Sequence, residues 1–174
     1  MVIDPLASYR ALCLRVDRFC DGIREKLADQ LACRKGCDSC CRHISLFPVE
    51  AVALRMALDD LPREMVETLR ARVGGGESDA CPLLMDGGCV VYASRPVICR
   101  THGFPLIVRD GDRTMVDVCP LNCTGIDSLS GDSVLDLDRL TLLLVAVNAD
   151  FVKHHSAPLP ERIRVRDIVL GRFP

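Results

Sequence analysis

Four cysteines fall within nine positions of the chain, in the stretch CRKGCDSCCRH at residues 33–43. Thiolates bind zinc, iron in iron–sulfur clusters and Cu(I), and closely spaced thiolates can reach one metal with little loss of chain entropy. Cys37 and Cys40 form a C-x2-C pair, and Gly36 just before them allows a tight backbone turn. The density of thiols in this stretch indicates a metal site.

The adjacency of Cys40 and Cys41 constrains how a metal could be held. Side chains of consecutive residues generally project in different directions, so one tetrahedral four-thiolate site does not easily accept both. The pair favours two metal centres, or two edges of one multinuclear cluster. Two four-thiolate centres need eight ligands, and the candidates are Cys33, Cys37, Cys40, Cys41, Cys81, Cys89, Cys99 and Cys119. A single iron–sulfur cluster, with the other thiols structural or redox-active, is the alternative, and the sequence leaves open which thiols share a metal.

The chain has eleven cysteines, an odd number, and its first residues lack the pattern of a secretory signal. We therefore expect a cytoplasmic protein with reduced thiols rather than disulfides. Cys13 and Cys20 lie beside the apolar stripe of an expected helix and should be buried apolar side chains. Cys123 is either a ninth ligand or a spare thiol. His43 and His102 are expected to be bystanders, or donors to the ligands.

The charge pattern bears on the partners. The net charge is −2, from 22 basic and 24 acidic residues, which leaves no electrostatic footprint for nucleic acid. No apolar run approaches the roughly 20 residues of a membrane span. We therefore expect neither a nucleic acid nor a membrane as partner, whereas a protein partner stays open. Five basic residues near the candidate ligands either stabilise thiolate charge or are ordinary solvated side chains; they are Arg34, Lys35, Arg42, Arg95 and Arg100.

Helices are predicted at both ends of the chain. Apolar residues recur in three- and four-residue steps over residues 5–31, which predicts a helix. Pro48 and Pro62 begin two further helical stretches, since proline suits the first turn of a helix. Residues 134–152 are dense in Leu and Val, and we expect this helix to be buried on most sides.

The middle of the chain favours short or irregular structure. GGGESD at residues 74–79 predicts a flexible break, and frequent Gly and Pro over residues 81–105 argue against long elements. PLIVRDGDRTMVDV predicts one small β-hairpin that turns at Asp110–Gly111. Residues 161–173 are ambiguous between strand and helix.

These elements predict a single domain over residues 1–174 with a helix-rich α+β fold. Flanking helices at residues 5–31 and 134–152 would enclose an irregular, cysteine-rich and metal-stapled middle at residues 33–123 that contains the hairpin.

The cysteine segments resemble a known family. CRKGCDSCC, CPLL, GCVVYASRPVICR and a late cysteine together resemble the bacterial cysteine-cluster family with the CxxCxxCC signature, a zinc- or iron-chelating domain. The resemblance covers residues 33–119, and its ligand positions would fall on the eight cysteines named above. The first gap holds three residues here instead of two. The resemblance also implies structural roles for Tyr92, Arg95 and Pro96, with Pro96 fixing a turn and Arg95 bonding carbonyls or sulfurs.

Three functions are compatible with these observations. The crowded cysteine pair and the excess of thiols favour an iron–sulfur or iron-binding protein with a redox, sensing or cluster-handling role. A zinc-stabilised protein-interaction module is the alternative, because closed all-thiolate zinc sites contribute folding energy without redox chemistry. A metal-dependent oxidoreductase or methyltransferase-like enzyme is a weaker alternative, because no S-adenosylmethionine-binding loop is recognisable.

Overall fold

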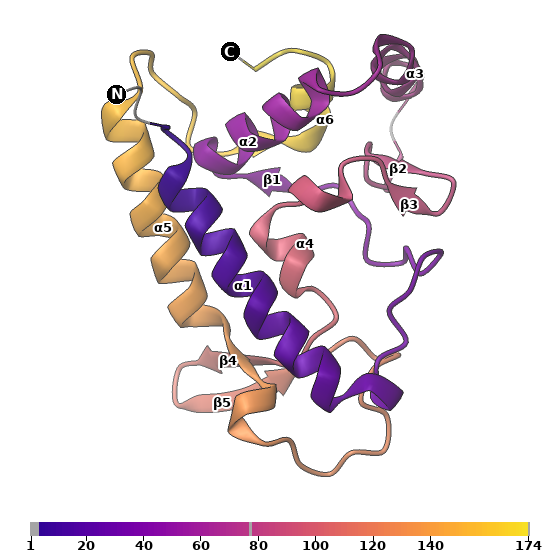
Figure 1. Ribbon diagram of the computed structural model, residues 1–174, viewed down its shortest axis with the longest axis vertical. Helices are drawn as coiled ribbons and strands as arrows, with labels where there is room; N and C mark the ends of the chain where they lie inside the picture. The colour runs from indigo at the N-terminus through magenta and orange to yellow at the C-terminus, as the bar shows by residue number, and fades with distance from the viewer. Residues whose placement is uncertain (1–3, 77, 174) are drawn as a thin grey trace.

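Two long helices, α1 (Ala7–Lys26) and α5 (Leu137–His154), lie side by side and run in opposite directions along one side of the molecule (Figure 1). The computed structural model describes residues 4–76 and 78–173. The buried side chains of α1 follow the apolar stripe expected from the sequence, and a short 3-10 helix, η1 (Ala28–Gln30), extends it. The helix predicted over residues 5–31 is therefore confirmed.

A second group combines two helices from the first half of the chain with one from its last residues. It comprises α2 (Pro48–Asp59), α3 (Arg63–Gly74) and the short α6 (Val165–Val169). Pro48 is the first residue of α2 and Pro62 immediately precedes α3, as their sequence positions predict. Strands β1 (Ser45–Leu46) and β7 (Ile163–Arg164) pair antiparallel beside α2 and α6. The ambiguous tail thus contains both a strand and a helix.

The remaining strands correct the prediction of a single hairpin. Strands β4 (Leu106–Asp110) and β5 (Arg113–Asp117) form the expected hairpin, and β6 (Leu135–Asp136) adds to β4 in parallel. The turn is Gly111–Asp112 rather than Asp110–Gly111, because Asp110 pairs with Arg113 in the ladder. A second hairpin joins β2 (Leu84–Met85) to β3 (Gly88–Cys89). The short elements left are η2 (Tyr92–Ser94), α4 (Val97–Thr101) and η3 (Gly131–Ser133).

The predicted break at residues 74–79 is partly confirmed. Helix α3 continues through Gly74, and residues 75, 76, 78 and 79 belong to neither a helix nor a strand. Residue 77 lies outside the described residues.

Two apolar cores hold these elements together. One joins α1 and α5 with Val49, Val97 and Phe104, and the other joins α2, α3, α6 and the β1–β7 pair. Cys13 and Cys20 are 6% and 2% exposed and belong to the first core, which confirms their prediction as buried apolar side chains. None of the eight candidate ligands is buried, and all eleven cysteines are free thiols.

The prediction that the last helix is buried on most sides is wrong. Only Leu140, Leu144 and Phe151 of α5 are buried, whereas Leu142 is 70% exposed. Helix α5 packs on α1, α2 and β4, and the rest of its surface meets solvent. Its density of Leu and Val therefore exceeds what its single buried face needs. In the described part of the chain, no helix combines the length and the apolar content needed to cross a membrane.

Candidate metal centre

The cysteine-bearing segments lie on the side of α4 away from α5 (Figure 1). They are the loop over residues 31–44 and the β2–β3 hairpin, and the short helix α4 itself carries Cys99. Segments far apart in the sequence therefore meet on one side of the molecule, and the contacts below divide their thiols into two sets.

One set contains Cys41, Cys81, Cys89 and Cys99, and is called the Cys41 set. The backbone N–H of Cys81 donates to the carbonyl of Cys41 at 2.9 Å, and Cys89 lies opposite Leu84 in the hairpin that follows Cys81. Burial, followed by the negative charges of Cys40 and Cys81, raises the pKa of the Cys41 thiol to about 11. Burial and the charges of Cys81 and Cys89 raise the pKa of the Cys99 thiol to about 12, although Cys99 as a whole residue is exposed.

The other set contains Cys33, Cys37, Cys40 and Cys119, and is called the Cys33 set. Burial raises the pKa of the Cys40 thiol, and the charges of Cys33 and Cys37 raise it further. Cys119 is tied to this loop through Asn122, whose side chain donates to the sulfur of Cys33 and whose backbone N–H donates to the carbonyl of Cys119. The side chains of Cys40 and Cys41 interact with each other. Beyond that pair, Cys40 has Cys33 and Cys37 as thiol neighbours, whereas Cys41 has Cys81 and Cys89.

The thiols of each set lie near one another but do not form a metal site. Within residues 4–76 and 78–173, no three Cys, His, Asp or Glu side chains lie close enough to hold one ion. Metal binding would have to draw the sulfurs of each set together. The loop bearing Cys33, Cys37 and Cys40 has no helix or strand over residues 31–44 and is held by turn hydrogen bonds, such as that from the Cys37 N–H to the Arg34 carbonyl at 2.9 Å. Its sulfurs can therefore move without breaking a helix or a sheet.

The chemistry of the donors fits zinc or iron. Every candidate ligand is a thiol, and thiolates select zinc and iron–sulfur clusters over hard cations such as Mg²⁺ and Ca²⁺. The backbone N–H groups of Leu83 and Val91 lower the pKa values of the Cys81 and Cys89 thiols by hydrogen bonding, against a larger increase from burial. Such bonds favour the thiolate form that binds metal. The assignment of the eight ligands stays a prediction.

Two tight turns join the segments that carry the two sets. Gly36 has a φ of +94° and its N–H donates to the carbonyl of Gly87 at 3.0 Å. Asp86 and Gly87 form the turn between β2 and β3 and both have positive φ, of 48° and 70°. A Cβ on Gly87 would lie 3.3 Å from the Cα of Gly36. The close packing of these turns therefore requires a residue without a side chain at position 87.

Helix α4, which carries Cys99, is fastened by a buried carboxylate. Glu50 is 4% exposed; its Oε1 accepts from the N–H of Val97 at 3.1 Å and its Oε2 from the N–H of Phe47 at 3.2 Å. Burial raises the pKa of Glu50, and the two N–H groups lower it. One side chain thus connects the N-terminus of α2 to the N-terminus of α4.

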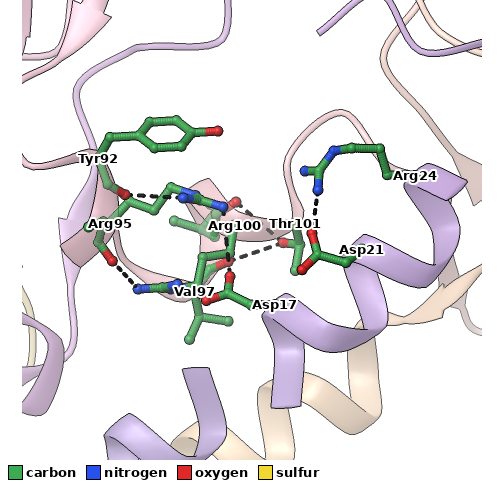
Figure 2. A network of polar contacts seen from close by, with 10 residues as sticks. Asp17, Asp21, Arg24, Tyr92, Arg95, Val97, Arg100 and Thr101 are labelled. Carbon is green, nitrogen blue, oxygen red and sulfur yellow. Dashed lines mark hydrogen bonds and ion pairs between the residues drawn. The ribbon is translucent and has the colours of Figure 1, made fainter. Parts of the chain in front are cut away.

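The segment that precedes α4 is clamped onto α1 by two arginines (Figure 2). Arg100 is buried and pairs with Asp17 of α1, and it also donates to the carbonyl of Ala93 at 2.9 Å. Arg95 donates to the carbonyl of Tyr92 at 3.1 Å and lies over its ring, with Nη2 3.7 Å from Asp17. The expectation that Arg95 bonds carbonyls is confirmed. The two arginines together hold the segment that leads to Cys99 against α1.

The basic residues near the thiols differ in part from those predicted. Arg95 lowers the pKa of the Cys89 thiol by its charge, as its sequence position suggested. Arg100 instead forms an ion pair with Asp17, and Arg42 donates to the carbonyl of Ser39 at 3.0 Å. Arg72 of α3, which the sequence did not single out, lowers the pKa of the Cys81 thiol. No local pattern could have identified Arg72, because only the fold brings α3 to the hairpin.

The second residue missed from the sequence is Asn122, whose position in the stretch CPLNC was a usable signal. It is a polar residue between two cysteines, and it is 2% exposed. Cys123, beside it, has a positive φ of 55° and donates its N–H to the carbonyl of Gln30 at 2.7 Å. Its role as a ligand is untested, and His43 and His102 are both exposed.

Comparison with known proteins gives one match. No curated protein and no solved structure shows significant similarity to the chain. The model of the CxxCxxCC family, described as "Putative zinc- or iron-chelating domain", matches residues 32–124, just over half of the chain. The matched range contains both sets of thiols. The chain therefore belongs to the CxxCxxCC family of metal-chelating domains.

Proposed function

We propose that the protein binds iron, as an iron–sulfur cluster or as thiolate-bound iron, at two centres formed by the Cys33 set and the Cys41 set. The observation that carries the proposal is the division of thiols on either side of the Cys40–Cys41 peptide bond. The side chains of Cys40 and Cys41 interact with each other. Beyond that pair, Cys40 has Cys33 and Cys37 as neighbours, whereas the backbone carbonyl of Cys41 accepts from the N–H of Cys81. With two four-thiolate centres, Cys40 binds one metal and Cys41 the other, so no metal has to bind two adjacent side chains.

The position of the thiols supports a redox, sensing or cluster-handling role. The candidate ligands are exposed or half-buried as residues, and none is a buried member of either apolar core, although Cys81 and Cys89 pack against the second. A metal that served only to replace a missing core would be expected inside one. Metal at an accessible surface can instead exchange electrons or ligands with another molecule, because burial and solvent access control redox potential and reactivity.

The residues of this chain would prepare the centres rather than perform a reaction. The N–H groups of Leu83 and Val91 and the charges of Arg72 and Arg95 offset the negative charge that accumulates on the sulfurs of the Cys41 set. Bound iron would supply a one-electron redox couple. The hydrogen bonds and nearby charges tune the potential of such a centre.

A zinc-stabilised protein-interaction module is the second candidate. The two N–H groups bonded to Cys81 and Cys89 would equally suit a closed four-thiolate zinc site. Zinc would order the loop of residues 31–44 against the hairpin, and the surface so formed would be the feature a partner recognises.

The test is metal and acid-labile sulfide per chain, with a visible absorption spectrum, on the full chain purified without oxygen. Iron with matching sulfide supports a cluster, and iron without sulfide supports thiolate-bound iron. About two zinc ions per chain, as two four-thiolate sites imply, with no sulfide, would replace the iron proposal by the zinc candidate. A protein that holds no metal after reconstitution with either ion would overturn both.

A further inference from the structure

The geometry points to Asn122 as a positioning residue for the metal centre of the Cys33 set, acting through an N–H···S hydrogen bond to Cys33. This inference rests on the proposed function, because it requires a metal at that set. Asn122 is no ligand itself. Its proposed work is to hold one ligating sulfur in place and to withdraw part of its negative charge.

Asn122 is placed where three segments of the chain meet. Its Nδ2 lies 3.3 Å from the sulfur of Cys33 and 2.7 Å from the carbonyl oxygen of Gly103. Its Oδ1 accepts from the N–H of Ala32 at 2.8 Å, and its backbone N–H donates to the carbonyl of Cys119 at 2.8 Å. Asn122 thereby joins Gly103, in the loop after α4, to Cys33 through its side chain and to Cys119 through its backbone.

The chemistry of the partners fixes the direction of the amide. The Ala32 N–H needs an acceptor and the Gly103 carbonyl needs a donor, so Oδ1 must face Ala32 and Nδ2 must face Gly103. The second hydrogen of Nδ2 is then available to the sulfur of Cys33. A carboxylate at this position would keep the bond to Ala32 and place a negative oxygen against the sulfur.

Gly103 closes the other side of the same sulfur. Its φ is +93°, and a Cβ there would lie 2.9 Å from the sulfur of Cys33 and 3.2 Å from Nδ2 of Asn122. The sulfur therefore has the Gly103 backbone on one side and an N–H donor on another, while Cys33 as a whole residue is exposed. A free surface thiol needs neither feature, whereas a ligand that must be held for a metal benefits from both, because partners of metal ligands orient them and tune the metal.

The test uses cobalt(II) as the probe metal on the full chain, because cobalt–thiolate charge-transfer absorption reports the sulfurs that bind it. Wild type should bind two ions. Asn122→Asp should weaken one of the two about 10-fold or more, the range typical of partners of metal ligands, and should leave the other unchanged. Asn148→Asp is the matched control, since Oδ1 of Asn148 caps the N–H of Val49 at 3.2 Å, away from the cysteines.

A double-mutant cycle separates an effect through the sulfur from a general loss of structure. In a Cys33→Ser background, Asn122→Asp should have little further effect on cobalt affinity, because its target is gone. Additive losses, or equal weakening of both ions, would overturn the inference. If circular dichroism shows that Asn122→Asp is unfolded, Asn122→Ser serves in its place, since it removes the donor without adding charge. Wild type that fails to bind two cobalt ions would instead overturn the proposed two centres.

Discussion

Cys40 and Cys41 are one peptide bond apart, and beyond each other their thiol neighbours differ. Each residue is therefore a separate test of one of the two centres. Cys40→Ser should lose the metal of the Cys33 set, and Cys41→Ser that of the Cys41 set, because a hydroxyl is a poor ligand for soft metals. Each variant should keep the other centre. The measurement is metal per chain by elemental analysis, beside wild type reconstituted in parallel. Full metal content in either variant would contradict the assignment of its thiol.

Cys13 provides the control for cysteine replacement as such. It is 6% exposed and belongs to the first core, which contains none of the candidate ligands. Cys13→Ala should keep the full metal content and lower the free energy of unfolding by about 1 kcal/mol, as removal of one buried methyl-sized group does. Loss of metal in this variant would mean that metal content follows overall stability rather than ligand identity.

The ligand candidates could be predicted because their signal is local, whereas the residues around them could not. Cys33, Cys37 and Cys40 lie within one short stretch of the sequence, and their close spacing alone indicates a metal site. Arg72 and Asn122 act on Cys81 and Cys33 only because the fold brings their segments together. Asn122 could be noticed as a polar residue between two cysteines, but no periodic pattern or spacing rule identifies the partner of either residue.

At the scale of elements, two glycines should respond to the same substitution with opposite sign. Gly87 occupies the β2–β3 turn with a φ of +70°, so Gly87→Ala should lower the free energy of unfolding by about 1–2 kcal/mol. Gly22 lies inside α1, and an added Cβ there meets no atom within 4 Å. Gly22→Ala should therefore raise the free energy of unfolding by about 0.5–1 kcal/mol. Urea unfolding of both variants measures the two changes, and a stabilising Gly87→Ala would contradict the turn geometry.

The start of α5 should make stability depend on acid. Asp136 caps this helix by accepting from the N–H of Arg139, and two bonds from Arg109 lower the pKa of its carboxyl to about 2. Because this pKa lies below the ordinary value of about 3.9, the carboxylate stabilises the fold above about pH 4. This contribution is lost as the pH falls towards 2.

The comparison variant is Asp136→Asn, which keeps a good N-cap but removes the charge. It should be less stable than wild type at pH 7, and the difference should shrink between about pH 4 and 2. Urea titrations across that range measure it. A difference that stays constant with pH would show that the ion pair with Arg109 contributes nothing to stability.

Element type was more predictable than element surroundings. The helices at α1, α2 and α3 follow from apolar periodicity and from Pro48 and Pro62, which act over a few residues. Strand β6 was missed because it has only two residues and pairs with β4, which lies far from it in the sequence. The exposure of α5 was missed for a related reason. Leu and Val report a preference for burial, but the number of neighbours available to bury them is a property of the whole fold.

At the scale of the molecule, the separation of cores from thiols predicts how the protein responds to metal removal. Most buried residues of both cores come from helices. Leu83 and Val91 of the second core lie beside Cys81 and Cys89, which pack against that core without being buried. The loop of residues 31–44 is held mainly by single contacts, such as that between Gly36 and Gly87. Chelation should therefore release the cysteine segments without unfolding the helices.

Hydrogen exchange measured by mass spectrometry, with and without a strong chelator, tests this expectation. Residues 31–44 and 118–124 should exchange faster after chelation, while α1, α2 and α5 keep their protection and the far-ultraviolet circular dichroism changes little. Cys41→Ser, measured without chelator, should show faster exchange mainly in the hairpin of β2 and β3. Global loss of protection on chelation would mean that folding free energy comes from metal binding, as it does in small zinc domains. That outcome would favour the zinc-stabilised module over accessible iron centres.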